Sequence, residues 1–143
     1  MADPLQPKNP AEQLGMFRVL WAALFASTII YIVVLELTTV ESGADWQSLA
    51  PMFALGGLGA AGASVLAPRF VRKRPPAEPT STQAAAPYLV ALILALALAE
   101  TVCILGLVLG FLGAPPSVVM PFFVVTWILM IVRFPTKEKL DAF

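Results

Sequence analysis

Apolar and polar positions fall into long separate blocks along the chain. Four blocks are almost wholly apolar and cover residues 15–40, 49–68, 88–112 and 118–134. A helix needs roughly 20 apolar residues, each rising about 1.5 Å, to cross the hydrocarbon core of a bilayer. The pattern therefore predicts an all-α polytopic membrane protein with four transmembrane helices.

The polar blocks between these segments predict connections of different kinds. Residues 1–14 are rich in proline and polar groups, and residues 69–87 begin basic and become rich in Pro, Ser, Thr and Ala. Because such stretches bury little apolar surface, we expect a disordered lead-in and a flexible loop. Residues 41–48 and 113–117 form short connections on the other side of the membrane, and residues 135–143 form a polar tail.

Composition agrees with the membrane assignment and restricts the chemistry. The 143 residues are 59% hydrophobic and 13% charged, and they include no histidine and a single cysteine, Cys103. Mean hydropathy is +0.84. The usual metal-ligand and nucleophile–base constellations are absent from such a sequence. We therefore expect no metal, no cofactor, no nucleic-acid partner and no enzymatic activity.

The basic residues predict how the chain is oriented. In the four-helix model all nine fall on one side of the membrane, whereas the opposite connections carry the acidic Glu41 and Asp45. Short cytoplasmic loops carry the excess of Lys and Arg, so both termini and the 69–87 loop are expected in the cytoplasm. We expect an integral protein of a bacterial inner (plasma) membrane. The nine residues are Lys8, Arg18, Arg69, Arg72, Lys73, Arg74, Arg133, Lys137 and Lys139.

Glu100 is the only charged residue in segment 88–112 and lies near its middle. An ionised side chain at this depth costs about 2.5–3.5 kcal/mol on insertion scales. Burial away from water favours the neutral acid, which is the state that a proton carrier starts from. Glu100 is therefore the candidate proton or cation site, with a structural interhelical hydrogen bond as the alternative. Glu36 lies near the outer boundary, where a carboxylate is tolerated.

Small residues predict close packing between helices in the second and third segments. Glycine and alanine let helix backbones approach closely enough for dispersion contacts to hold them together. In segment 88–112 these residues form a stripe about a quarter turn from Glu100. We expect tight helix neighbours and assembly with further copies of the chain. The packing candidates are Gly56, Gly57, Gly59, Gly62, Ala95, Ala99, Gly106 and Gly110.

The order of these features resembles the c-subunit (proteolipid) family of rotary ATP synthases. The resemblance covers residues 49–112: a glycine-rich segment, a basic loop, and the stretch Ala97-Leu-Ala-Glu100-Thr-Val-Cys-Ile-Leu-Gly106. It implies a ring in which Glu100 carries the ion between adjacent helices, with the Thr101 hydroxyl beside it. Sodium-binding members supply a glutamine from the first helix of the hairpin, and segment 49–68 has none, which favours protons.

Three functions are consistent with the sequence. The leading hypothesis is a proteolipid-like protein that binds a proton or cation at Glu100 and forms an oligomer or ring. The second is a structural or assembly subunit of a larger membrane complex, without transport. The third is a small ion-coupled multidrug-type transporter, although such proteins carry their acid in the first helix, where this chain has only Glu36. The expected partners are membrane lipid, further copies of the chain and other membrane subunits.

Overall fold

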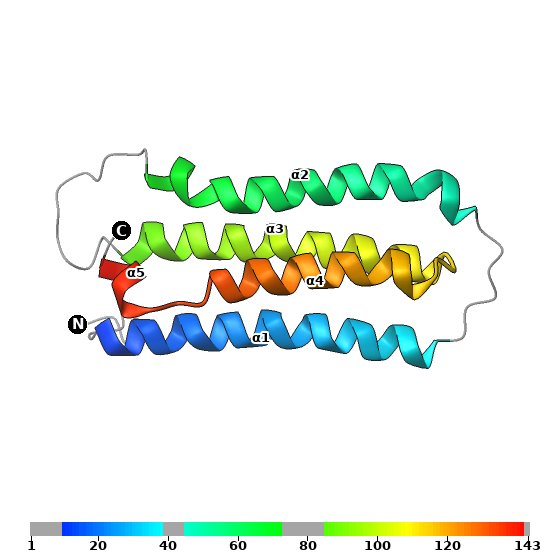
Figure 1. The fold of residues 1–143 in the computed structure, drawn as a ribbon. Helices are drawn as coiled ribbons and strands as arrows, with labels where there is room; N and C mark the ends of the chain where they lie inside the picture. Colours follow the sequence, from blue (N-terminus) through cyan, green and yellow to red (C-terminus); the bar gives the residue numbers. More distant parts are fainter. Residues whose placement is uncertain (1–9, 39–44, 73–84, 142–143) are drawn as a thin grey trace, which may run out of the picture.

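The computed structural model describes residues 10–38, 45–72 and 85–141, and every regular element within them is a helix. Successive long helices run in opposite directions, so that the starts of α1 and α3 and the ends of α2 and α4 meet at one end of the bundle (Figure 1). The elements are α1 (Pro10–Leu37), α2 (Trp46–Arg72), α3 (Ala85–Phe111), α4 (Pro116–Val132) and α5 (Lys137–Asp141).

Three of these helices, α1, α2 and α3, are long and apolar enough to cross a membrane, and α4 is a shorter apolar helix. Large apolar side chains cover the outside of the bundle; Leu55 and Leu58, for example, are each 71% exposed. Soluble monomers rarely expose apolar surface over whole faces of a bundle. The helices therefore identify an integral membrane protein.

Helix α3 is the centre of the bundle. It packs against α2, α4 and α1, most extensively against α2, while α1 and α2 lie on opposite sides of the α3–α4 pair (Figure 1). Small side chains make this position possible, because Ala95, Ala99 and Cys103 are completely buried. At the α2 contact, the buried Ser64 Oγ donates a hydrogen bond to the Ala95 carbonyl at 2.8 Å.

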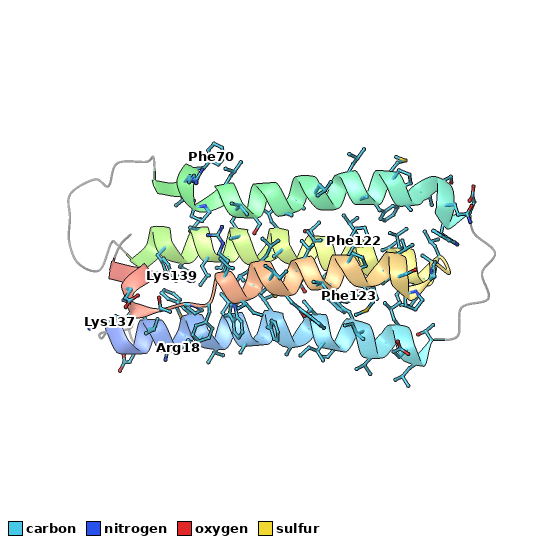
Figure 2. All side chains as sticks on the ribbon, in the orientation of Figure 1. Arg18, Phe70, Phe122, Phe123, Lys137 and Lys139 are labelled. Carbon is cyan, nitrogen blue, oxygen red and sulfur yellow. The ribbon has the colours of Figure 1, made fainter. Side chains whose placement is uncertain are left out.

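The described basic side chains gather at one end of the bundle, which we call the basic end. Figure 2 shows Arg18, Lys137 and Lys139 together there, beside α5. Glu36 and Asp45 flank the α1–α2 connection at the opposite end, where α1 finishes and α2 begins. The described chain therefore separates its basic side chains from these two acids along the long axis.

Buried apolar residues form two clusters, one toward each end of the bundle. The basic-end core contains Phe17, Tyr88, Leu92, Leu96, Ala99 and Met130, with Trp21, Leu24 and Phe25 packed against it. The opposite-end core contains Cys103, Leu109, Ala114, Val119 and Phe123, with Tyr31, Ile32 and Leu35 packed against it. Glu100 lies between residues of the two cores along α3.

Helix α1 begins at Pro10, five residues before the expected start of the first segment at residue 15. Proline at the first helical position is favourable because its fixed φ suits the helix and its missing N–H would be unpaired there. Glu12 in the first turn adds a favourable interaction with the helix dipole. The expected lead-in 1–14 is thus helical from Pro10, and its first nine residues lie outside the described part.

Part of the expected polar tail 135–143 forms the short helix α5. The Lys139 backbone N–H donates to Thr136 Oγ1 at 3.4 Å, so Thr136 helps to cap this turn. The Lys139 ammonium then donates to the carbonyls of Val132 at 2.7 Å and Phe134 at 3.1 Å. The Val132 carbonyl ends α4 and that of Phe134 lies just beyond it, at the helix C-terminus where a cation is favourable.

Helix α2 passes through Pro68, the expected end of its segment, and continues to Arg72. Proline offers no N–H to the carbonyl four residues earlier, which here is that of Ser64. Arg133 supplies the missing donor, since its Nη2 lies 3.0 Å from the Ser64 carbonyl oxygen and 3.1 Å from that of Val65. Of the expected 69–87 loop, residues 73–84 lie outside the described part. Of the expected 41–48 connection, residues 41–44 lie outside it, and α2 already begins at Trp46.

The α3–α4 connection is a compact turn. Gly113 has φ of 85°, a left-handed conformation that glycine adopts without strain. The Ala114 N–H donates to the Leu109 carbonyl at 3.0 Å and the Gly113 N–H to that of Gly110 at 2.9 Å. This pair of bonds is the Schellman motif, which satisfies the last carbonyls of α3. Helix α4 then starts at Pro116, after the extended Pro115.

Candidate functional site

Glu100 lies near the middle of the apolar span of α3. With a rise of about 1.5 Å per residue, its Cα is about 18 Å along the axis from Tyr88 and about 17 Å from Phe111. Its side chain is half-buried on the side of α3 that faces α1. Packing against α1 therefore sets the surroundings of the carboxyl group.

Two hydroxyl groups of α1 hold one oxygen of this carboxyl. Ser27 Oγ and the Tyr31 hydroxyl each lie 2.9 Å from Glu100 Oε1 and donate to it. Ser27 and Tyr31 are four residues apart, so both hydroxyls project from the same face of α1. Both polar partners that the structure gives to Glu100 are therefore neutral hydroxyls of a neighbouring helix.

Ser27 has a second hydrogen-bond partner, and this matters for protonation. Its Oγ lies 2.7 Å from the carbonyl oxygen of Leu24, one turn earlier in α1. A hydroxyl has one hydrogen and two lone pairs. Ser27 can therefore donate to an ionised Glu100, or turn its hydrogen to Leu24 and accept one from the protonated acid. The same heavy-atom positions suit both forms of the carboxyl.

A second set of polar side chains links α4 to its neighbours near the Glu100 level. Trp127 Nε1 donates to Thr28 Oγ1 at 3.0 Å, joining α4 to α1. Thr126 Oγ1 lies 3.0 Å from the Ala99 carbonyl oxygen, joining α4 to α3. In the described part of the chain, every fully buried side-chain nitrogen and oxygen has a hydrogen-bond partner. This layer fixes α1, α3 and α4 around the carboxyl.

Thr101, the hydroxyl expected beside Glu100, serves its own helix. Its side chain is exposed, and its Oγ1 donates to the Ala97 carbonyl at 2.9 Å. The hydroxyls on the carboxyl come instead from Ser27 and Tyr31, which sequence reasoning did not single out. The available signal was that Ser27 and Tyr31 are polar residues four apart near the middle of a largely apolar segment.

The small residues expected at helix contacts in α3 lie against other helices of the same chain. Ala95 and Ala99 are completely buried. A Cβ added at Gly106 would lie 2.6 Å from Phe122 Cβ of α4, and one added at Gly110 would lie 2.6 Å from Leu35 Cδ2 of α1. This stripe of α3 therefore admits α4 and α1 at close range.

The glycines of α2 divide between the inside and the outside of the bundle. Gly57 is buried, and an added Cβ would lie 3.1 Å from Phe122 Cε1, whereas one at Gly56 would lie 3.5 Å from Leu105 Cδ1. Gly59 and Gly62 are exposed, with nothing within 4 Å of an added Cβ in the described structure. The outer face of α2 thus has no partner within the described chain at these two positions.

The described residues contain no group of three or more His, Cys, Asp or Glu side chains that could hold a metal ion. No family model, no curated protein and no solved structure matches the chain. The likeness of residues 49–112 to the rotary c-subunits therefore stays an expectation from the sequence.

Proposed function

We propose that this chain is an integral membrane protein that binds and releases a proton at Glu100 and works as an oligomer. The observation that carries the proposal is a half-buried carboxyl at mid-span whose Oε1 accepts from two hydroxyls, Ser27 and Tyr31, at 2.9 Å each. An acid within a transmembrane helix commonly marks an ion or proton pathway.

The hydrogen-bond pattern supports proton exchange in particular. When Glu100 is ionised, both hydroxyls donate to Oε1 and stabilise the charge. When it is neutral, Ser27 turns to the Leu24 carbonyl, 2.7 Å away, and accepts from the acid. Neither protonation state of Glu100 leaves a hydroxyl unpaired. The proton can therefore bind and be released without a change of helix packing.

Assembly and orientation belong to the same proposal. Gly59 and Ala63 are exposed four residues apart on α2, the spacing at which small residues let a second helix approach closely. A second copy is the proposed neighbour, in a ring if the resemblance to the rotary c-subunits extends to assembly. The basic end is proposed to lie in the cytoplasm, since short cytoplasmic segments carry the excess of Lys and Arg.

A structural role is the second candidate, and one observation favours it. Both partners of Glu100 belong to the same chain, so the carboxyl also clamps α1 onto α3. Interhelical hydrogen bonds in membranes contribute about 0.6 kcal/mol on average. Glu100→Gln distinguishes the two roles, because the amide oxygen can still accept from Ser27 and Tyr31 while the side chain no longer exchanges a proton.

Reaction with dicyclohexylcarbodiimide tests the proposal, because the reagent requires a protonated carboxyl in an apolar setting. The protein in lipid vesicles should form one adduct at Glu100, located by peptide mass spectrometry, and the reaction should slow as pH rises. Glu36→Gln serves as the matched control and should label normally, whereas Glu100→Gln should not label. A wild-type protein without an adduct at Glu100, or with a rate independent of pH, would contradict proton binding there.

A further inference from the structure

A groove of about 250 Å³ lies between α2 and α4, with Val102 of α3 also lining it. All of its lining side chains are apolar. Ala54 and Leu58 of α2 and Pro121 and Val125 of α4 line the groove and are exposed, so it opens at the surface of the bundle. In a membrane this surface meets lipid tails, which an apolar groove accepts.

The rows of residues that form the groove continue toward the basic end. On α2, Ala61 of the groove is followed at intervals of four residues by Val65 and Arg69, which are both exposed. On α4, Arg133 lies eight residues beyond Val125 of the groove. Residues four apart are neighbours on one face of a helix. Because α2 and α4 both run toward the basic end (Figure 1), the two rows lead to the two arginines.

Arg133 reaches across from the end of α4 to α2 at this end of the groove. Its Nη2 donates to the carbonyls of Ser64 and Val65, about one turn beyond Ala61. A guanidinium has five N–H groups, and those on Nε and Nη1 donate to no residue that the structure describes. Fully buried side-chain nitrogens in the described part all have partners, so Nε and Nη1 are accessible from outside the bundle.

The chain beyond Arg133 turns away from α2. Figure 1 shows that α4 ends short of the basic-end tips of α2 and α3 and that the chain then passes toward α1. Phe134 fits this turn, since its ring meets that of Trp21 of α1 edge to face, with centroids 5.0 Å apart. The Val65 carbonyl, which Arg133 binds, points along α2 toward Arg69. Two guanidinium groups therefore lie at the basic end of the groove.

We propose that this groove and its two arginines bind an anionic phospholipid. The phosphate lies against Arg133 and Arg69, and one acyl chain lies along the groove between α2 and α4. Arginine N–H groups match phosphate oxygens in geometry and charge. The guanidinium of Arg133 is about one helical turn, 5.4 Å, from the nearest groove residue, which leaves space for the glycerol between phosphate and chain.

Charge favours a lipid over a second copy of the chain as the occupant. None of the described carboxylates pairs with the Arg133 guanidinium. Basic pockets between transmembrane helices accept anionic headgroups, which supply the missing counter-charge. A second copy inserted in the same direction brings its own basic end to this level, and like charges repel. The lipid site is independent of proton binding at Glu100.

Native mass spectrometry of the protein in mild detergent tests the site. The protein is titrated with dioleoyl phosphatidylglycerol, which is anionic, and with dioleoyl phosphatidylcholine, which has the same chains and no net charge. Arg133→Gln and Arg69→Gln each remove a guanidinium, and Ala61→Met fills the groove. Arg18→Gln is the control for charge, because Arg18 lies at the same end on α1, across the α3–α4 pair from α2 (Figures 1 and 2). Ala23→Met is the control for bulk, because Ala23 is exposed on α1.

Wild type should bind phosphatidylglycerol about tenfold more tightly than phosphatidylcholine. Each of the two groove arginines should contribute about fivefold, the factor expected for one basic residue at a membrane surface. Ala61→Met should weaken the binding of both lipids, because it acts on the chain and not on the headgroup. Both control variants should stay within about twofold of wild type.

Equal losses in Arg18→Gln and Arg69→Gln would overturn the site, because binding would then follow the total charge of the basic end. Equal effects of Ala23→Met and Ala61→Met would exclude the groove. A lipid-free dimer that Ala61→Met dissociates would also contradict the proposal, since a second copy would then fill the groove. If Arg133→Gln fails to fold, Arg69→Gln and Ala61→Met decide, because both leave the bonds from Arg133 to α2 in place.

Discussion

The Tyr31 hydroxyl donates to Glu100 Oε1 at 2.9 Å and joins the least buried long helix of the bundle, α1, to the most buried one, α3. Most of the surface of α1 faces outward, so few contacts fix its position. The hydrogen bonds on the carboxyl are therefore among the few that hold α1 in place, beside those of Trp127 to Thr28 and of Trp21 to the Met130 carbonyl. Tyr31 and Glu100 are therefore energetically coupled through this contact.

The coupling can be measured by a double-mutant cycle. Tyr31→Phe should destabilise the wild-type protein by about 0.6 kcal/mol, and by no more than about 1.7 kcal/mol, the range for such bonds in membranes. In a Glu100→Leu background the same change should have almost no effect, because the acceptor is already gone. Reversible unfolding in mixed detergent measures each stability. An equal effect in both backgrounds would show that the hydroxyl contributes nothing through Glu100.

A glycine series tests how closely α3 and α4 approach. Gly106→Ala places a Cβ 2.6 Å from Phe122 Cβ and 3.4 Å from the Val119 carbonyl oxygen, atoms at or beside the backbone that have little room to move. We expect a loss of about 1–3 kcal/mol, typical of overpacking. Gly110→Ala should cost less, since it meets the flexible tip of Leu35.

Gly62→Ala is the control for this series, because nothing lies within 4 Å of its added Cβ. The alanine should leave the monomer unchanged or stabilise it by up to about 1 kcal/mol through helix propensity. Unfolding of the three variants under one set of conditions ranks them. A Gly106→Ala protein as stable as the Gly62→Ala protein would contradict the close approach of Phe122.

Arg133 and Pro68 give a third prediction. Arg133→Ala removes the donor to the Ser64 and Val65 carbonyls and should destabilise the protein by about 1–3 kcal/mol, as for a charged hydrogen-bond donor. Pro68→Ala provides a backbone N–H for the Ser64 carbonyl and should reduce the effect of the arginine change. Thermal unfolding of the two single variants and the double variant measures this. Strictly additive effects would mean that the arginine does not compensate for the proline.

The outer face of α2 gives a prediction about assembly. Gly59→Leu adds bulk where small residues would let a second copy approach, so it should lower the oligomer mass in mild detergent. Gly15→Leu is the control, because Gly15 also has nothing within 4 Å of an added Cβ but lies near the start of α1. Native mass measurements compare the two variants. The same oligomer in both would exclude this face of α2 as the contact.

Sequence was sufficient for the all-helical architecture, because long apolar blocks are a strong local signal. The residues at which the helices begin and end were harder to predict. Pro10 and Glu12 start α1 earlier than hydropathy alone indicates, since N-terminal preferences extend a helix into polar sequence. Pro68 looked like the end of its segment, but Arg133, 65 residues later, compensates for the missing donor. A contact at that distance along the chain leaves no trace in the local pattern.

The candidate site at Glu100 was likewise only partly predictable from the sequence. Glu100 stands out because a lone acid in an apolar span is unusual. Its partners depend on which helix lies against which face of α3, and segments of similar hydropathy do not specify that pairing. Ser27 and Tyr31 were therefore not identified, while Thr101, adjacent in sequence, points to the Ala97 carbonyl of its own helix.

The most direct test of the central claim is a pH titration of the carboxyl C=O band in lipid bilayers, taken as wild type minus Glu100→Gln. Proton binding at Glu100 predicts a band that is present in wild type, lost in the variant, and reversibly removed and restored as pH is cycled. Ser27→Ala and Tyr31→Phe should shift its frequency, because each removes a hydrogen bond to Oε1. A difference spectrum without such a band at any pH would contradict the account.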